Sequence, residues 1–264
     1  MMIKYNFKNK LVLVLASSKG IGFELAKEYL AHGAYVAICG RNTKNLNFAK
    51  KQIKELNFDN RMRFFRIDLS KIENIKKLYL RVRKSFKKDI DILINNSGGP
   101  ESKKILQTKI KDWDYALNNN LKSFILMSMQ VLPAMKKNKW GRIINLTSAT
   151  AKEPAERMVL SNVTRAGVLA FSKTLSKETK INGITVNSIL TGGVITDRLI
   201  QLIKKNNKGN IKSLISKIAK NIPVQHIAYP KEFIQMILFL STEEASYVNG
   251  AAISVDGGIS KTIF

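Results

Sequence analysis

Cysteine and histidine are scarce in this chain of 264 residues, which has one cysteine, Cys39, and two histidines, His32 and His226. A single cysteine excludes a disulfide framework and a metal site built from several cysteines. Two histidines far apart in the chain argue against a histidine-rich metal site, so we expect no metal centre. The low cysteine content also suits a reducing compartment, and we predict a cytoplasmic location.

Long apolar runs are absent as well. No stretch approaches the ~18–20 apolar residues of a membrane helix, so we predict no membrane partner. Residues 1–16 superficially resemble a signal peptide, but their apolar run, Leu11–Ala16, has only six residues and leads directly into a glycine-rich turn. We therefore interpret this run as a buried strand.

Acidic residues are few: 19 against 45 basic residues, which gives a net charge of +26. One interpretation is a polyanionic partner, such as nucleic acid, anionic lipid or an acidic carrier protein. The other is codon bias in an AT-rich genome, because 35 of the bases are lysines scattered along the chain. Since no arginine–aromatic cluster accompanies them, we favour the second interpretation and predict no nucleic-acid partner.

Short β-rich runs alternate with amphipathic segments of helical length. The apolar content of 45% is enough for a sizeable core. We predict seven strands: Leu11–Leu15, Tyr35–Cys39, Arg63–Ile67, Ile90–Ile94, Arg142–Leu146, Thr185–Ile189 and Ala252–Val255. The predicted helices are Gly20–His32, Thr43–Leu56, a helix to about Phe86 that opens with a capping box at Ser70–Glu73, and segments near 111–136, 159–179 and 230–240.

Strands that alternate with helices pair in parallel through right-handed crossovers. We therefore predict an α/β fold: a single doubly wound, mostly parallel seven-stranded sheet with helices on both faces, in one Rossmann-like domain over 1–264. Such sheets bind ligands outside the carboxyl ends of their strands. Gly20-Ile21-Gly22 lies at such an end, where backbone N–H groups and a helix N-terminus can hold a pyrophosphate. The alternative is a plain strand–helix turn.

Several motifs in the right order resemble those of the short-chain dehydrogenase/reductase family, over almost the whole chain. The matching segments are Leu15–Gly22, Asp68-Leu69, Asn95–Gly98, Asn120, Ile143–Ser148 and Ser246–Gly258. Two residues depart from the family's first glycine-rich turn, because Leu15 replaces a threonine and Ala16 replaces a glycine. The Ala16 methyl group stands where the backbone bends most sharply, so we expect a slightly reshaped phosphate turn.

The resemblance implies a nicotinamide cofactor and a set of site residues. The catalytic candidates are Asn120, Ser148, Ser161 and Arg165. The cofactor-binding candidates are Ala16, Ser18, Lys19, Gly20, Ile21, Gly22, Arg41, Asp68, Leu69, Asn96, Arg165, Val194 and Thr196. For Asn120 and Ser148, purely structural roles are the alternative: bridging backbone groups and ending a strand.

Charge favours NADP(H) as the cofactor. NAD binders usually place a carboxylate after the second strand, whereas this chain has Gly40-Arg41-Asn42 there. Lys19 stands inside the phosphate turn, so two cations are expected near the 2′-phosphate that distinguishes NADP. The alternative is that both are surface bases of a lysine-rich protein.

The resemblance fails at the proton donor. The family's catalytic Tyr follows its Ser by about thirteen residues, and a Lys follows the Tyr by four. Here those positions are Ser161 and Arg165, and no tyrosine lies between Tyr115 and Tyr229. An aliphatic hydroxyl is far less acidic than a phenol, so Ser161 is a poor general acid by itself. Arg165 stays protonated, and it can hold ribose hydroxyls or stabilise an alkoxide.

Three hypotheses follow for this site. Hydride transfer continues with water or with Lys152, Glu153 or Glu156 as the proton source. Alternatively, Ser148 and Ser161 only orient a substrate that is activated in another way. In the third hypothesis the chain binds NADP without turnover, as a sensor or scaffold.

After the predicted sixth strand, Thr191 stands before Gly192 where the family has a proline. Val194 and Thr196, which follow, are expected to contact the nicotinamide amide. Residues 197–228 are predicted to form a substrate lid, whose apolar side chains cover substrate or pack onto the body. The expected partner is a small-molecule or carrier-bound carbonyl substrate, with a 3-oxoacyl thioester as one candidate. The family commonly assembles through helices like those near 111–136 and 159–179, so the resemblance implies a homodimer or homotetramer.

Overall fold

The computed structural model describes residues 4–56, 59–179, 183–206 and 209–263, so residues 207–208 of the predicted lid lie outside the described part. Its centre is a seven-stranded, wholly parallel sheet in the order β3-β2-β1-β4-β5-β6-β7. The strands are β1 (Leu11–Val14), β2 (Tyr35–Gly40), β3 (Met62–Arg66), β4 (Ile92–Asn95), β5 (Gly141–Leu146), β6 (Ile184–Thr191) and β7 (Ala252–Val255). The order reverses direction between β1 and β4, which is where such sheets bind ligands. The predicted fold class is confirmed.

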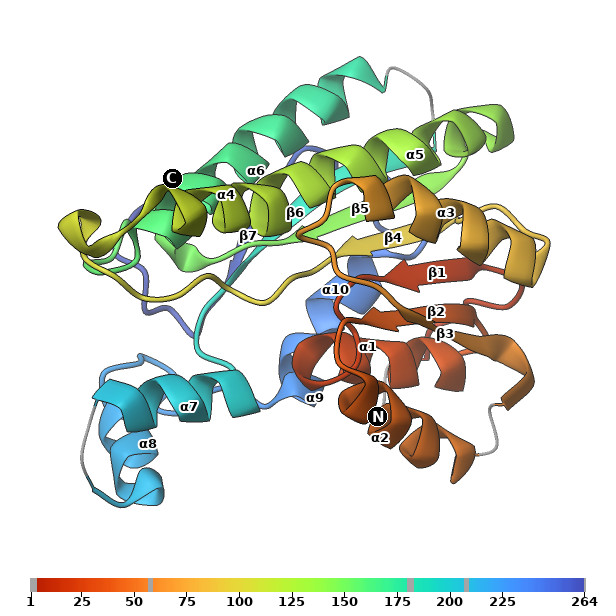
Figure 1. Ribbon diagram of the computed structural model, residues 1–264. Helices are drawn as coiled ribbons and strands as arrows, with labels where there is room; N and C mark the ends of the chain where they lie inside the picture. The colour runs from red at the N-terminus through yellow and green to blue at the C-terminus, as the bar shows by residue number, and fades with distance from the viewer. Residues whose placement is uncertain (1–3, 57–58, 180–182, 207–208, 264) are drawn as a thin grey trace.

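Helices connect successive strands and pack on both faces of the sheet (Figure 1). They are α1 (Gly20–Ala31), α2 (Thr43–Lys54), α3 (Glu73–Phe86), α4 (Ile110–Leu117), α5 (Ser123–Asn138), α6 (Val159–Glu178), α7 (Asp197–Asn206), α8 (Ile211–Ala219), α9 (Pro230–Phe233) and α10 (Gln235–Leu240). Short 3-10 turns span Asp59–Arg61, Ile105–Gln107 and Ala149–Ala151, and a π-helical turn spans Asn118–Lys122. In Figure 1, α7 and α8 extend beyond the end of the sheet to which the strands point.

Two apolar clusters, one on each face of the sheet, explain why β1 is a continuous apolar run. Val12 and Val14 lie in the cluster formed with α1, α2, α9 and α10. Leu11 and Leu13 lie in the other cluster, formed with α3 and α5. Because successive strand residues point to opposite faces, a strand that is covered on both sides needs apolar residues at every position. Burial of these side chains from water is the main stabilising contribution of the core.

Three details of the predicted helices are wrong. The Ser70–Glu73 capping box does not form, because α3 begins only at Glu73 and the Ser70 hydroxyl donates to Asp68 Oδ1 at 2.7 Å instead. The helix expected near 111–136 is divided into α4 and α5 by the π-helical turn. The helix expected over 230–240 breaks at Ile234 into α9 and α10.

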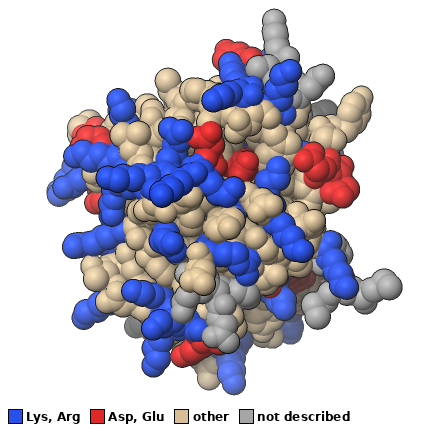
Figure 2. All heavy atoms as spheres, turned by 90° about the vertical axis from the view of Figure 1, so that its right-hand side faces the viewer, with Lys and Arg blue, Asp and Glu red and all other residues tan. Residues whose placement is uncertain are grey.

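Lysine and arginine cover much of the end of the molecule where the strands begin (Figure 2). The last turns of several helices carry them: Lys51 and Lys54 in α2, Arg83 and Lys84 in α3, and Lys136 and Lys137 in α5. A helix C-terminus carries partial negative charge, so bases are stabilising at these positions. Part of the positive charge therefore has a local structural explanation.

The sequence predicts neither a membrane helix nor a metal centre, and the described residues can be compared with both predictions. Among them, no helix combines the length and the apolar character that crossing a membrane requires. No group of three or more His, Cys, Asp or Glu side chains within the described ranges could hold a metal ion. Cys39 is a free, buried cysteine.

Candidate active site

The turn between β1 and α1 has the close packing that a phosphate-binding turn needs. A Cβ atom on Gly22 would lie 2.9 Å from the carbonyl oxygen of Ala16, from Cα of Ser17 and from Nδ2 of Asn96. Gly20 has a φ of +60°, which L side chains rarely adopt. The Ala16 φ is +46°, so the backbone keeps a left-handed bend in spite of the methyl group. The turn therefore keeps its path, with local backbone strain at Ala16.

Asn96, two residues beyond the end of the predicted fourth strand, fixes the same turn from the neighbouring strand. Its Nδ2 donates to the carbonyl oxygens of Leu15 at 3.1 Å and Ala16 at 3.2 Å. These bonds tie the end of β4 to the end of β1, the two strands between which the sheet order reverses. The first N–H groups of α1 follow this turn, and a helix N-terminus of this kind is a general binding place for phosphate groups.

The bases predicted to hold the 2′-phosphate lie at the surface beside this turn. Arg41 follows β2 directly, is exposed, and donates from Nη1 to the Tyr115 hydroxyl at 2.8 Å. Lys19 is exposed at the N-cap of α1, with Nζ 3.8 Å from Oδ2 of Asp197. No acidic residue follows β2 before α2. These residues suit a cofactor that carries an additional phosphate.

The remaining predicted cofactor residues are spread along the carboxyl ends of the strands. Asp68 accepts hydrogen bonds from the backbone and side chain of Ser70. Leu69 is buried in the core on the α3 side, and Ile21 packs against the opposite core. Ser18 packs close to Gly40, since a Cβ there would lie 2.7 Å from Ser18 Oγ.

The segment after β6 reaches back to the phosphate turn. A Cβ on Gly20 would lie 3.5 Å from Cγ2 of Thr196. The Thr196 hydroxyl donates to the Val194 carbonyl oxygen at 3.3 Å and accepts from the N–H of Leu199. Val194 is buried. The structure thus brings Thr196 beside the glycine-rich turn.

Helix α7 contacts both the glycine-rich turn and the loop that follows β4. Asp197 pairs with Lys19 on the turn side, and Arg198 Nη2 donates to the Pro100 carbonyl oxygen at 2.7 Å on the other side. The predicted lid begins with these two residues. Its function as a lid is not tested by this arrangement and stays a prediction.

Asn120 lies within the π-helical turn, and its side chain is completely buried. Its Nδ2 donates to Ser97 Oγ at 2.7 Å and to the Gly98 carbonyl oxygen at 2.9 Å, whereas Oδ1 has no partner among the described residues. Single π-helical turns within helices are frequent at functional sites, because they expose backbone groups and re-aim side chains. Asn120 is therefore held against the end of β4.

Arg165 is buried beneath the same strand ends, with a residue exposure of 5%. Its Nη1 donates to the Leu146 carbonyl oxygen at 2.8 Å and its Nη2 to Ser97 Oγ at 3.3 Å. No carboxylate pairs with it in the described part of the chain. Burial lowers the pKa of Arg165 to about 10, so it remains a cation at neutral pH.

The two candidate serines belong to neighbouring elements. Ser148 follows β5, and its Oγ accepts from the N–H of Thr150 at 3.2 Å and lies 3.1 Å from Thr150 Oγ1. Ser161 is buried in α6, one helical turn before Arg165. Among the described residues, the guanidinium contacts Ser97 rather than either of these serines.

Two of the alternative proton sources are engaged away from Arg165. Lys152 Nζ donates to the Ala252 carbonyl oxygen at 3.3 Å, and Glu153 Oε2 accepts from the N–H of Lys261 at 2.9 Å. Both contacts direct these side chains toward β7 and the C-terminal segment. Glu156 instead lines a hollow of about 530 Å³ with Ser102, Arg157, Met158 and Lys205.

A family model described as "Enoyl-(Acyl carrier protein) reductase" matches residues 15–260, nearly the whole chain. The chain belongs to the short-chain dehydrogenase/reductase family. A curated relative is the 3-oxoacyl-[acyl-carrier-protein] reductase FabG of Buchnera aphidicola subsp. Baizongia pistaciae, which is 31% identical over 252 residues and covers 95% of this chain and 97% of the relative.

Solved reductases of this family have the same architecture. The L-sorbose reductase of Gluconobacter frateurii, complexed with NADPH and L-sorbose, superposes with a TM-score of 0.92 at 29% identity, covering 99% of this chain and all of that one. YwfH, an NADPH-dependent reductase of bacilysin biosynthesis, gives 0.88 at 28% identity, covering 96% and 99%. The predicted cofactor, NADP(H), agrees with both names, and the residues described above fit it.

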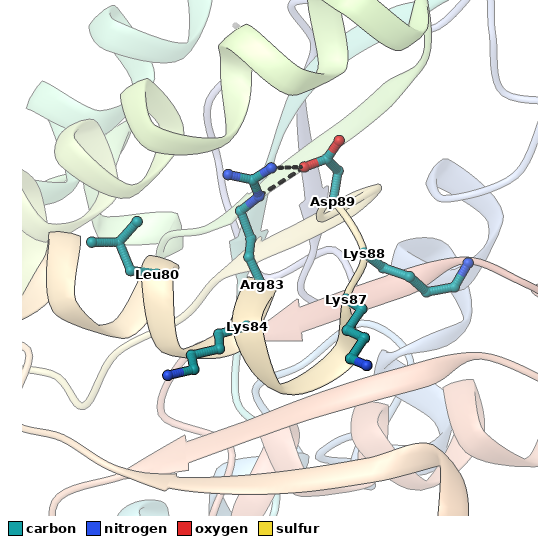
Figure 3. A pocket seen from close by; sticks show the side chains of 6 residues that line it. All are labelled: Leu80, Arg83, Lys84, Lys87, Lys88 and Asp89. Atoms are coloured by element: carbon teal, nitrogen blue, oxygen red, sulfur yellow. Dashed lines mark hydrogen bonds and ion pairs between the residues drawn. The ribbon is translucent and has the colours of Figure 1, made fainter.

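One hollow on the surface of this chain lies far from the candidate site residues. It has a volume of about 430 Å³ and is lined by Leu80, Arg83, Lys84, Lys87, Lys88 and Asp89 at the C-terminal end of α3 (Figure 3). Arg83 pairs there with Asp89 at 2.7 Å. The strands begin at this end, whereas the cofactor turn and Arg165 lie where they finish. The hollow is therefore not the candidate active site.

Two residues of the site were not selected from the sequence. Ser97 belongs to the Asn95–Gly98 motif, where the family has alanine, and it receives hydrogen bonds from both Asn120 and Arg165. That exchange of alanine for serine was the available signal. Tyr115, the partner of Arg41, lies on α4 and gave no signal in the sequence.

Proposed function

We propose that this oxidoreductase transfers a hydride between NADP(H) and a carbonyl or secondary alcohol, although Ser161 and Arg165 replace the family's tyrosine and lysine. The observation that supports this most strongly is the position of Arg165. A buried cation without a carboxylate partner is costly unless it acts on an anion, and an alkoxide forms when a carbonyl is reduced. The guanidinium lies at the ends of β4 and β5, beside the ligand-binding edge of the sheet.

NADPH, when bound, supplies the hydride. The chain's own residues bind the cofactor and orient the substrate. The turn at Ser18–Gly22 offers N–H groups to the pyrophosphate, with Lys19 and Arg41 near the additional phosphate. Arg165 stabilises negative charge as it develops on the substrate oxygen or holds the ribose hydroxyls, and Ser148 and Ser161 position the oxygen. Asn120 supports the site through Ser97 and the Gly98 carbonyl.

The substrate class follows from the relatives only in part. Reductases of 3-oxoacyl carrier proteins and of a ketose are both similar to this chain. We propose a ketone flanked by polar groups, with a 3-oxoacyl thioester as the first candidate. The second function to consider is NADP binding without turnover, as a sensor or scaffold, which the loss of the Tyr/Lys pair favours.

The test is to incubate purified protein and NADPH with 3-oxoacyl thioesters, ketoses and cyclic ketones. An enzyme consumes the absorbance of the reduced nicotinamide with at least one of them, and Arg165→Met does so far more slowly. Calorimetry measures NADPH binding in parallel. Tight binding without turnover on any carbonyl would contradict the enzymatic proposal and support the non-enzyme.

A further inference from the structure

The Ser97 hydroxyl receives two hydrogen bonds and has one hydrogen left to give. Its oxygen accepts from Asn120 Nδ2 at 2.7 Å and from Arg165 Nη2 at 3.3 Å. A hydroxyl oxygen has two lone pairs and one hydrogen, so both acceptor positions are used. No acceptor for that hydrogen lies within hydrogen-bond distance among the residues that the structure describes. The O–H bond is therefore available to a ligand.

Ser97 stands at the edge of the sheet where the substrate is expected. Asn95 of β4 and Asn145 of β5 are register partners, so the residues that follow each strand emerge side by side. Ser97 comes two residues after β4, and Ser148 comes two residues after β5. Arg165 joins the two strand ends through Ser97 Oγ and the Leu146 carbonyl. The structure thus brings Ser97, the guanidinium and the segment that carries Ser148 to the same edge of the sheet.

The donors around Ser97 make it a better acid than the other serines. A hydroxyl that accepts a hydrogen bond from a guanidinium in a buried site loses its proton more readily, because the cation stabilises the resulting anion. Among the described residues, the hydrogen bonds to the Ser148 hydroxyl come from the neutral N–H and hydroxyl groups of Thr150. Ser161 receives no hydrogen bond from Arg165 within the described residues.

We propose that Ser97 is a catalytic residue, and that its hydroxyl gives the substrate oxygen the proton that the family's tyrosine gives elsewhere. The assignment rests on the carbonyl reduction proposed above. As the hydride adds to the carbonyl carbon, the C=O π pair moves to oxygen, and that oxygen takes the proton from Ser97 Oγ. The Ser97 oxygen, held by Asn120 and Arg165, regains a proton from water. The net reaction consumes one hydride and one proton.

The first test needs no turnover. In Ser97→Cys the new thiol is titrated by its alkylation rate as a function of pH. The native Cys39 stays silent, because it is fully buried and burial raises its pKa to about 12. We expect a Cys pKa at least ~1 unit below the ordinary value of about 8.5, since neighbouring cations stabilise thiolates. The matched control is Ser148→Cys, where we expect no comparable shift.

Two cations can act on residue 97, and the test separates them. Arg165 contacts it directly, and Arg198 reaches the same loop at Pro100. Adding Arg165→Met to Ser97→Cys should return the thiol pKa to its ordinary value, whereas adding Arg198→Met should leave most of the shift. An ordinary thiol pKa in Ser97→Cys itself, or a shift that survives Arg165→Met, overturns the assignment.

The second test is kinetic, on the carbonyl substrate found above. Ser97→Ala should lower kcat about 100-fold, as expected for loss of a general acid, while the Kd for NADPH changes less than ~2-fold. Ser97→Thr keeps the hydroxyl and should retain kcat within ~10-fold of the wild type. A solvent deuterium isotope effect on the wild-type rate should be present and should vanish in Ser97→Ala.

The outcomes separate this assignment from the proposed function. If the wild type reduces a ketone and Ser97→Ala keeps kcat within threefold, or loses NADPH binding in proportion, only the role of Ser97 is overturned. If the wild type binds NADPH and reduces no carbonyl, the proposed function fails and the proton-donor role falls with it, whatever the thiol pKa.

Discussion

The proposed phosphate turn, at 16–22, and the proposed reduction site, around Ser161 and Arg165, differ in how they depart from the family pattern. At the turn, Ala16 replaces glycine, yet its φ remains left-handed and Asn96 still holds the carbonyls of Leu15 and Ala16. At the proposed reduction site, Ser161 and Arg165 stand where the resemblance predicts the tyrosine and lysine of the family's proton transfer. A turn that binds through backbone N–H groups keeps its ligand as long as the backbone path is kept. A site that works through side chains changes its chemistry with each substitution.

The largest effect is expected at the reduction site, for Arg165→Met. Removing the cation should lower kcat/KM about 10²–10³-fold, because no other base contacts Ser97 in the described chain. The free energy of unfolding at neutral pH should fall by no more than ~1 kcal/mol, since two hydrogen bonds are lost while the cost of a buried charge disappears. Steady-state kinetics and urea denaturation measure the two quantities.

The same variant has a pH signature. The folded-state pKa of Arg165, about 10, lies below the ordinary pKa of an arginine, so the unfolded chain binds more protons between these values. The cost of burying the cation is complete below pH 10 and fades as the pH rises above 10 toward the ordinary pKa of an arginine. The stability of Arg165→Met relative to the wild type should therefore decline above pH 10. A constant difference over that range would contradict the buried-cation description.

The comparison is sharpened at the turn by Gly22→Ala. The new Cβ would lie 2.9 Å from backbone atoms of Ala16 and Ser17, so the turn must shift. We expect a loss of ~1–3 kcal/mol in unfolding free energy and at least ~10-fold weaker NADPH binding. Thermal unfolding and calorimetry measure both. Gly98→Ala is the control for stability, because its Cβ meets nothing within 4 Å.

In Arg41→Asp we expect a loss of NADPH affinity that is smaller than the loss of kcat/KM in Arg165→Met. Loss of a charge-assisted bond to the 2′-phosphate costs ~1.5–3 kcal/mol, which is about 10–150-fold in the Kd for NADPH. NAD should bind equally well or better. Tyr115→Phe is the matched control, since it removes only the hydroxyl that Arg41 contacts. Unchanged NADPH affinity in Arg41→Asp would refute the role of this arginine.

The smallest effect is expected for Ala16→Gly. A left-handed residue with a Cβ costs ~1–2 kcal/mol, and glycine gives back part of that in unfolded-state entropy. We expect a net gain of ~0.5–1 kcal/mol in unfolding free energy with NADPH affinity unchanged or slightly better. Ala34→Gly, at a buried alanine without a positive φ, should destabilise instead. A loss of stability in Ala16→Gly would show that the turn carries no strain.

The fold was predictable because its signals are repeated: the run of β1 and the amphipathic helices each indicate the same layered sheet. The turn was predictable because Gly20 and Gly22 directly follow the first strand and open the first helix, a placement typical of a phosphate-binding turn. Ser97 was not, because a single serine in a motif acquires its role only when Asn120 and Arg165, 23 and 68 residues away, converge on it. The π-helical turn that aims Asn120 has no sequence signature. The assembly into dimers or tetramers remains a prediction.

Helix α7 begins with two adjacent, oppositely charged residues that contact two different segments, the glycine-rich turn and the loop after β4. The tie between Lys19 and Asp197 is a 3.8 Å contact between exposed side chains, whereas Arg198 donates to a carbonyl at 2.7 Å. Salt screens the first far more than the second. Raising ionic strength should thus weaken the contact of α7 with the glycine-rich turn, while its hydrogen bond to the Pro100 carbonyl is kept.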